Sequence, residues 1–258
     1  MIIYRSFSSF FAKEERFGSF KSLVLLVAFA ILATSNSYAQ ASFETIDGLR
    51  YLIDSDAKTA TLTAKTGGEK YSGNIVVPEK VKASNGVEYT VTSLVEKCFY
   101  GCSGLTSITI PSSVTSLGES CFEECSGLTS ITIPSSVTSL GKSCFADCYE
   151  LTSITIHSSV TSLSSMCFYG CHRLTSINIP SSVTSLGASC FQDCSGLTSI
   201  TIPSSVTSLE YRCFSGCSGL TSITIPSSVT SLGESCFEYC IYNHRTTKTN
   251  QKYPSVNL

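Results

Sequence analysis

A 23-residue unit recurs six times in this chain with no insertion or deletion between copies, and this repeat limits the folds open to it. The copies begin at Leu105, Leu128, Leu151, Leu174, Leu197 and Leu220. Each unit has eight apolar positions among Ser, Thr, Gly, Pro and acidic residues, too few to close a core alone. Copies that stack bury the apolar face that each presents to the next. The sequence therefore predicts a repeat solenoid.

The first full copy predicts the path of each coil. Residues 107–110 alternate with period two, which predicts a short strand with Ile108 and Ile110 inward. Copies that run in one direction must pair in parallel, one such strand per coil. Residues 114–117 predict a second short extended piece. Residues 119–125 have apolar side chains at the i, i+1 and i+4 positions of a helical or 3-10 turn on the opposite side.

The segments that flank the six copies complete the predicted domain organisation. An imperfect copy precedes them, interrupted by about ten residues around 84–86 that predict a turn or small hairpin, so seven coils span residues 71–242. Within residues 40–70, two alternating segments around a turn predict a β-hairpin cap over the first coil. Residues 243–258 have no apolar period and predict a loose tail.

The first 39 residues have the composition of a secretory signal peptide. A basic lead is followed by an apolar run over residues 23–33 and by small residues at 37–39. Eleven apolar residues are too few to cross a bilayer, so we expect no integral membrane span once cleavage after Ala39 has occurred. No Cys stands near this point, which argues against a lipid anchor.

The repeat resembles a known family. Leu105-x-x-Ile108-x-Ile110 fits the leucine-rich repeat pattern, and the continuation IPSSVTSLGxSCFxxCSGL is similar to the BspA-like (treponemal-type) family of bacterial surface proteins. The resemblance covers about residues 71–242. Where that family usually has Ala-Phe, this chain has Cys-Phe in every coil, a change that a core accepts because Cys is close to Ala in size. The resemblance implies an exported or surface-associated binding protein, with adhesion as one role.

All fourteen Cys fall in seven Cys-x-x-x-Cys pairs at one phase of the repeat, from Cys98 and Cys102 to Cys236 and Cys240. Metal binding is admissible from the spacing, but seven equal half-sites beside an inward Phe indicate packing columns instead. Disulfides are permitted in an exported chain, although the column spacing of about 4.8 Å exceeds the usual Cβ separation. We favour buried free thiols, and we predict no metal site and no cofactor.

A catalytic site is not indicated by the polar residues. His157 replaces the repeat's Pro, and His172 stands at a turn position usually held by Ser; neither has a repeat-breaking Asp, Cys or Ser placed as its partner. We therefore predict that the chain is not an enzyme. Between Leu105 and Tyr242 there are nine acidic and three basic residues, which disfavours nucleic acid as a partner.

One outward position of the predicted strand is nearly constant between copies. Its six residues form the predicted binding ladder: Thr109, Thr132, Thr155, Asn178, Thr201 and Thr224. Solenoid sheets offer extended surfaces to partners, so this ladder is the candidate site for an extracellular protein or glycan. A merely solvated sheet is the alternative for these residues.

The predicted function follows from the resemblance and the predicted export. We expect a secreted or bacterial cell-surface protein that binds proteins or glycans, with an adhesin role as the finer expectation and no catalysis. The alternative is a structural spacer, or a truncated fragment of a larger repeat protein. The oligomeric state cannot be read from the sequence.

Overall fold

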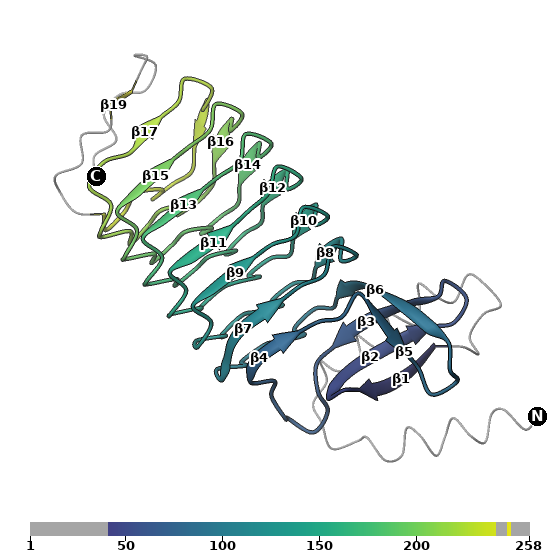
Figure 1. The fold of residues 1–258 in the computed structure, drawn as a ribbon. Helices are drawn as coiled ribbons and strands as arrows, with labels where there is room; N and C mark the ends of the chain where they lie inside the picture. The colour runs from purple at the N-terminus through teal and green to yellow at the C-terminus, as the bar shows by residue number, and fades with distance from the viewer. Residues whose placement is uncertain (1–40, 241–246, 249–258) are drawn as a thin grey trace, which may run out of the picture. The chain divides into compact units, whose positions relative to one another are not determined.

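The computed structural model describes residues 41–240 and 247–248, almost all of which belong to one compact unit, Ser42–Leu258. The predicted signal peptide lies outside the described residues, as does most of the predicted tail. Within the unit, coils of 23 residues stack in sequence order, as Figure 1 shows. The predicted solenoid is confirmed.

Each full coil contributes a strand to a first row, with the parallel pairing that the repeat predicted. In register, Ile154 lies beside Ile131 and Ile177 beside Ile200, one repeat apart in each case. Inward Ile residues are buried while the Ser and Thr between them are exposed. The strands of this first row are β4 (Gly73–Val76), β7 (Leu105–Thr109), β9 (Ser130–Thr132), β11 (Ser153–Thr155), β13 (Ser176–Asn178), β15 (Ser199–Thr201), β17 (Thr224–Ile225) and β19 (Thr247–Lys248).

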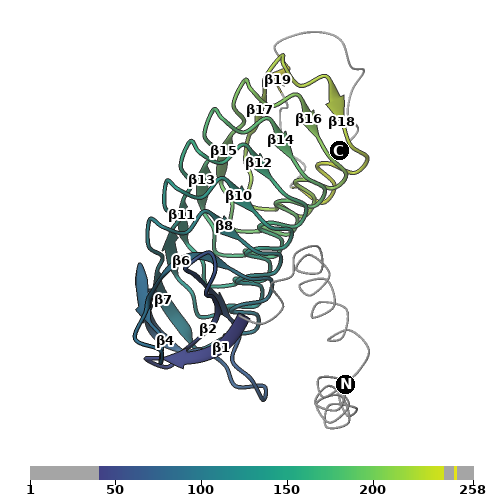
Figure 2. The ribbon, with the colours of Figure 1, turned by 90° about the vertical axis from the view of Figure 1, so that its right-hand side faces the viewer.

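The second extended piece of each coil is also a strand, so two rows of parallel strands run along the stack. Figure 2 shows this second row in order along the coils. Its Leu residues are mostly buried in the core, at Leu117 and Leu140 among others. The strands of the second row are β8 (Ser116–Leu117), β10 (Ser139–Leu140), β12 (Ser162–Leu163), β14 (Ser185–Leu186), β16 (Ser208–Leu209) and β18 (Ser231–Leu232).

The N-terminal cap continues the second row. β1 (Ala41–Ile46), β2 (Leu49–Asp54) and β3 (Thr59–Thr63) lie side by side, and β2 and β3 form the predicted antiparallel hairpin. β3 then pairs in parallel with β6 (Glu88–Leu94), which pairs with β8. The insertion forms the predicted small hairpin, in which β5 (Lys80–Lys82) pairs with β6. The cap therefore covers the strand edge of the first coil.

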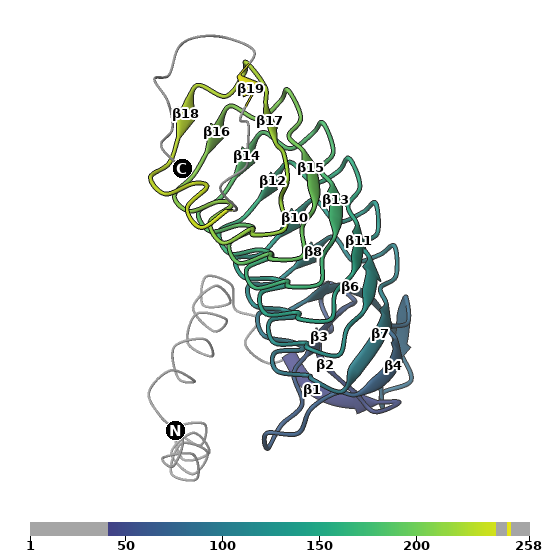
Figure 3. The same cartoon turned by 90° about the vertical axis from the view of Figure 1, so that its left-hand side faces the viewer.

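The third side of each coil, residues 119–125 in the first full copy, is a turn without a helix. The prediction of a helical or 3-10 turn there was wrong, because the described residues contain no helix of either kind. Two positions per coil have positive φ, for example Ser120 at 53° and Glu124 at 59°. N–H groups point alternately within the coil and toward the next coil: Cys125 donates to Phe122 O, whereas Phe122 donates to Cys144 O. The apolar spacing was identified correctly, but every second N–H group bonds to the next coil, so the local bonds do not run consecutively as they do in a helix. Figure 3 shows these turns one behind another.

The core lies between the two strand rows and the turns. Seven Phe rings, from Phe99 to Phe237, stack along the coils with centroids 5.1 to 5.7 Å apart and planes within 9° of parallel. Tyr71 of the segment after the cap hairpin adds an eighth ring at 5.0 Å from Phe99. Each apolar side chain thus finds its partner one repeat away, which a single isolated coil could not supply.

One short strand lies in the range predicted as a loose tail. β19 pairs with β17, and its two residues stand 23 positions after their partners, Thr224 and Ile225. At Thr247 and Lys248 the backbone thus continues the first strand row by one position, while the rest of the predicted tail lies outside the described residues.

Candidate interaction surface

The structure places all six predicted ladder residues in one line on the exposed side of the first strand row. Thr132 lies beside Thr155, Asn178 beside Thr201, and Thr201 beside Thr224. All six side chains are exposed. The inward Ile residues on either side fix their direction, since alternate residues of a strand point to opposite faces.

The ladder hydroxyls differ from their neighbours in having no partner. None of the six ladder side chains makes a hydrogen bond within the described part of the chain. Two Thr residues that precede the strands do: Thr152 Oγ1 donates to Thr129 O at 3.1 Å, and Thr198 Oγ1 donates to Thr175 O at 3.2 Å. The ladder therefore presents donors and acceptors that are free for an external molecule.

The first strand of the row changes the character of the ladder at its N-terminal end. Val76 pairs with Thr109 and is 68% exposed, so an apolar side chain occupies the position that Thr holds elsewhere. Beside it, Asn74 Oδ1 accepts hydrogen bonds from Thr106 Oγ1 at 2.8 Å and Ser107 Oγ at 2.9 Å. The sequence held a signal for Val76, because aligning the imperfect copy with the full ones puts it at the ladder position.

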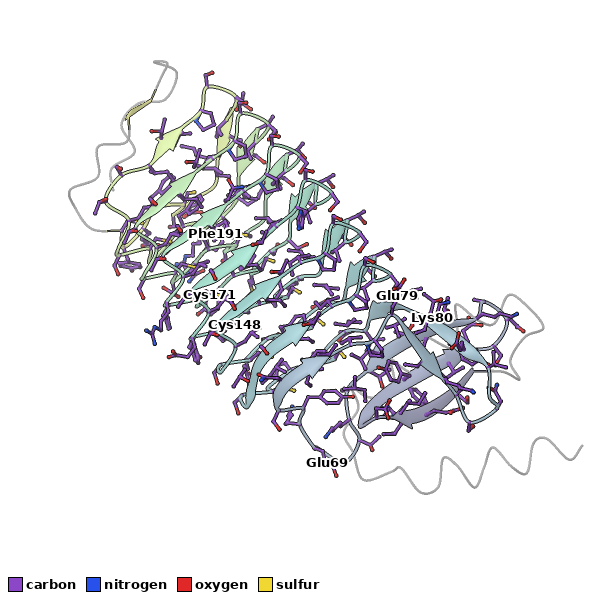
Figure 4. All side chains as sticks on the ribbon, in the orientation of Figure 1. Glu69, Glu79, Lys80, Cys148, Cys171 and Phe191 are labelled. Atoms are coloured by element: carbon purple, nitrogen blue, oxygen red, sulfur yellow. The ribbon has the colours of Figure 1, made fainter. Side chains whose placement is uncertain are left out.

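The Cys residues form two buried columns inside the coils, and all fourteen are free thiols. In the second column the six thiols from Cys125 to Cys240 each donate to the Phe carbonyl of the preceding coil, as Cys171 Sγ does to Phe145 O at 3.2 Å. Burial raises the pKa of these thiols, to about 11 at Cys240. Figure 4 marks Cys148, Cys171 and Phe191 within the stack. The columns serve packing, and their raised pKa values keep thiolate reactivity low.

A metal site is also absent from the described residues, where no group of three or more His, Cys, Asp or Glu side chains is placed to hold an ion. The same residues contain no helix that is long and apolar enough to cross a bilayer. Both findings concern residues 41–240 and 247–248 alone.

Variable side chains gather on the turn side of the coils. Tyr100 donates from its hydroxyl to Glu124 Oε1 at 2.8 Å, and the Tyr149 and His172 rings stack with centroids 5.3 Å apart. His172 Nδ1 lies 2.9 Å from Asp193 O, so its ring is held by the turn backbone. Ser195 Oγ also lies 3.5 Å from the same nitrogen, so these contacts fix the turn side chains to one another and to the turn backbone.

The acidic turn residues include one with a shifted proton affinity. Burial, followed by the nearby negative charges of Glu123 and Glu124, raises the pKa of Asp147, and a hydrogen bond from Tyr149 opposes the shift. Farther along the same side, Arg173 forms an ion pair with Glu150 of the preceding coil. Some of the charged and polar side chains on the turn side therefore have ion-pair or hydrogen-bond partners in a neighbouring coil.

Comparisons with known proteins agree with this geometry. The family model of the BspA type leucine-rich repeat region matches residues 83–198 and 184–255, with six copies. A leucine-rich repeat protein of T. pallidum, TpLRR, is similar at 25% identity over 75% of this chain and 88% of that one, with a TM-score of 0.63. No curated protein matches this chain.

Two further solved structures share the repeat architecture. A leucine-rich repeat protein from Eubacterium ventriosum is 25% identical, with a TM-score of 0.64 over 86% of this chain and 53% of that one. The pneumococcal vaccine antigen PcpA is 15% identical over 81% of this chain and 71% of that one, with a TM-score of 0.50, and shows likeness of fold alone. Because the family model spans more than half of the sequence, the chain belongs to the BspA-type leucine-rich repeat family.

Proposed function

We propose that this chain is a secreted or bacterial cell-surface protein that binds an extracellular protein or glycan through the ladder, and that it catalyses no reaction. The unpartnered, exposed line of ladder side chains carries the proposal. Neighbouring rungs stand about 4.8 Å apart, so a ligand that spans several coils meets many weak hydrogen bonds at once. Adhesion, in which many modest contacts act together, suits such a surface.

Two features of the sequence support the proposed location. Residues 1–39 have the order of a signal peptide, and the array has few charged residues but many hydroxyl groups, which solvate it. The chain also belongs to the BspA-type family, and the repeat is similar to the BspA-like proteins of bacterial surfaces. Absence of catalysis is supported by the uniformity of the coils, because an enzyme needs convergent polar groups at one place.

A triple variant tests the ladder directly. Thr132→Glu, Thr155→Glu and Thr201→Glu place three carboxylates along the line without touching the buried Ile residues. Binding of the purified chain to immobilised extracellular-matrix proteins and to bacterial surface polysaccharides is then measured. We expect the variant to lose about tenfold or more in apparent affinity, since each carboxylate displaces a hydroxyl donor.

The same coils provide a matched control. Thr138→Glu, Thr161→Glu and Thr207→Glu add the same charge at exposed positions beside the second strand row. We expect this control to bind like the unmodified chain. Equal loss in both triple variants would show a general charge effect, and equal retention in both would remove the ladder as the binding surface. An unmodified chain that binds none of these materials would instead favour a structural spacer.

A further inference from the structure

The cap contains an open cavity that the ladder does not use. Its volume is about 220 Å³, smaller than the 300 Å³ or more that is usual for a drug-sized ligand, so it fits one chemical group of a larger molecule. Two cations reach it from neighbouring parts of the cap. The lining residues are Thr45, Gly48, Arg50, Lys65, Thr66 and Glu69.

Arg50 is held in place by contacts that leave part of its guanidinium group unused. Its Cζ lies 3.8 Å from the centroid of the Phe43 ring. Nη1 donates to Thr63 Oγ1 at 3.3 Å and to Ala64 O at 3.4 Å. Within the described residues no carboxylate forms an ion pair with Arg50. The side chain is therefore both oriented and electrostatically unpaired.

Lys65 supplies the second positive charge. Its Nζ lies 5.2 Å from the centroid of the Tyr71 ring, and its side chain is 31% exposed. Glu69 approaches Nζ only at 4.0 Å, and its own side chain is 75% exposed, on the loop marked in Figure 4. A contact this long and this exposed contributes little, so Lys65 remains available to another anion.

We propose that the cap cavity is a binding subsite for the carboxylate of an acidic sugar residue, such as a uronic acid within a polysaccharide. The guanidinium of Arg50 offers the planar fork that matches a carboxylate, and Lys65 adds a second charge. Thr45 and Thr66 place hydroxyl groups beside these cations. Phe43 lies outside the cavity lining, but its half-exposed ring, which stacks on Arg50, adds an apolar surface beside the opening for a sugar face.

A sugar suits the cavity better than an acidic peptide side chain. The two hydroxyl-bearing residues and the exposed aromatic ring match the alternation of hydroxyl groups and C–H faces on a pyranose. The opening to solvent leaves room for the rest of a polysaccharide. This subsite goes beyond the proposed function, because its residues lie in the cap and share none with the ladder.

Titration with small probes tests the assignment. D-Glucuronate, D-glucose, free L-glutamate and inorganic sulfate are each added to the purified chain, and cap signals are followed by NMR. We expect glucuronate to shift signals from Arg50 and Lys65 with a dissociation constant on the order of 1 mM, as suits one small group. Glucose should produce no comparable shift. Glutamate or sulfate binding as tightly as glucuronate would overturn the sugar assignment.

Variants separate the fork from general charge. Arg50→Lys keeps the charge but loses the fork, and should weaken glucuronate binding about tenfold. Lys65→Gln should weaken it by a similar factor and does not depend on the packing of Arg50. Glu69→Gln should strengthen binding about threefold, because it removes the nearest negative charge. Lys80→Gln, an exposed control on β5, should leave binding unchanged.

Three results would overturn the subsite. The first is unchanged affinity in both Arg50→Lys and Lys65→Gln. The second is weaker binding in Glu69→Gln, since that carboxylate should oppose an anion. The third is an equal effect of Lys80→Gln, which would show attraction to net charge alone. None of these measurements involves the ladder, so their failure would leave the proposed function as it stands.

Discussion

The strand side and the turn side of the coils are both joined by backbone hydrogen bonds, yet their sequences vary very differently. On the strand side Thr132, Thr155 and Thr201 recur at one position. On the turn side the position of Glu124 is held by Asp147 and Gly170 in the next two coils. The backbone at these turn positions nevertheless stays the same, with φ of 59°, 56° and 67°.

The difference teaches that backbone register, more than side-chain identity, joins the turns of neighbouring coils. Phe122 N donates to Cys144 O and Glu124 N donates to Ala146 O, so the bonds between coils come from the main chain. The residue type varies at the second positive-φ position of each coil, from Glu124 to Asp147 and Gly170, while the backbone conformation stays the same.

The largest effect is expected from emptying one place in the Phe stack. Phe168→Ala removes a fully buried ring that lies between Phe145 and Phe191, and should lower the free energy of unfolding by about 3–5 kcal/mol. Tyr169→Ala, one residue along on the turn side, should cost far less. Urea denaturation of both variants measures this contrast, and similar losses would contradict the interior placement of the Phe column.

The two Cys columns should differ in their tolerance of Ala. Cys171→Ala removes a buried thiol and leaves Phe145 O with only its longer bond from Cys148 N, so we expect a loss of about 2 kcal/mol. Cys167→Ala restores the residue common at that position in the resembled family, and should cost under about 1 kcal/mol. Thermal unfolding in the presence of a reductant would compare them. A larger loss for Cys167→Ala would reverse the order.

Replacing Ser by Val should lower the free energy of unfolding on the turn side but not on the strand side. Ser189 has a φ of 55°, where a β-branched residue is strained, so Ser189→Val should cost about 1–2 kcal/mol. Ser185 lies in β14, and Ser185→Val should be neutral or slightly stabilising there. Ser189→Gly serves as a check that strain is the cause, because it should be nearly neutral. Equal effects of the two Val substitutions in denaturant unfolding would remove the contrast.

The smallest effect concerns pH on the turn side. The pKa of Asp147 is raised in the folded chain, so the unfolded chain releases that proton first as pH rises. Stability should therefore fall slightly as pH rises through the window just above the ordinary Asp value. Asp147→Asn should flatten this part of the stability curve by no more than about 0.5 kcal/mol, since the carboxylate is only partly buried and solvent screens it. If the unmodified chain and Asp147→Asn had the same dependence of stability on pH between pH 3.5 and 6, the raised pKa of Asp147 would be contradicted.

The repeat made the strand rows predictable because each inward residue recurs 23 positions later. Ile108 and Ile110 were placed inward by alternation alone, and the ladder followed from the residue between them. The turn was predicted wrongly because i, i+1, i+4 spacing is compatible with a helix. The alternation of Asp and Gly at 147, 170, 193 and 216 was the available sign of positive φ.

The cap cavity could not be predicted in the same way. Arg50 and Lys65 stand fifteen positions apart in a segment that has no internal repeat to compare. Only the pairing of β2 with β3, in which Arg50 faces Thr63, brings them to one cavity. The place of Val76 in the ladder row was only partly predictable: it follows from aligning the imperfect copy with the full ones.

If the chain is exported as proposed, its fourteen buried thiols affect how long it keeps its fold outside the cell. Each thiol is shielded only once its own coil has been covered by the next, so stacking protects the sulfur atoms one coil at a time. A chain that opens in an oxidising medium exposes these thiols, and any disulfide that forms between them before the coils restack blocks the buried arrangement. Durability outside the cell would then depend on how rarely the stack opens, and refolding after full opening would require a reductant.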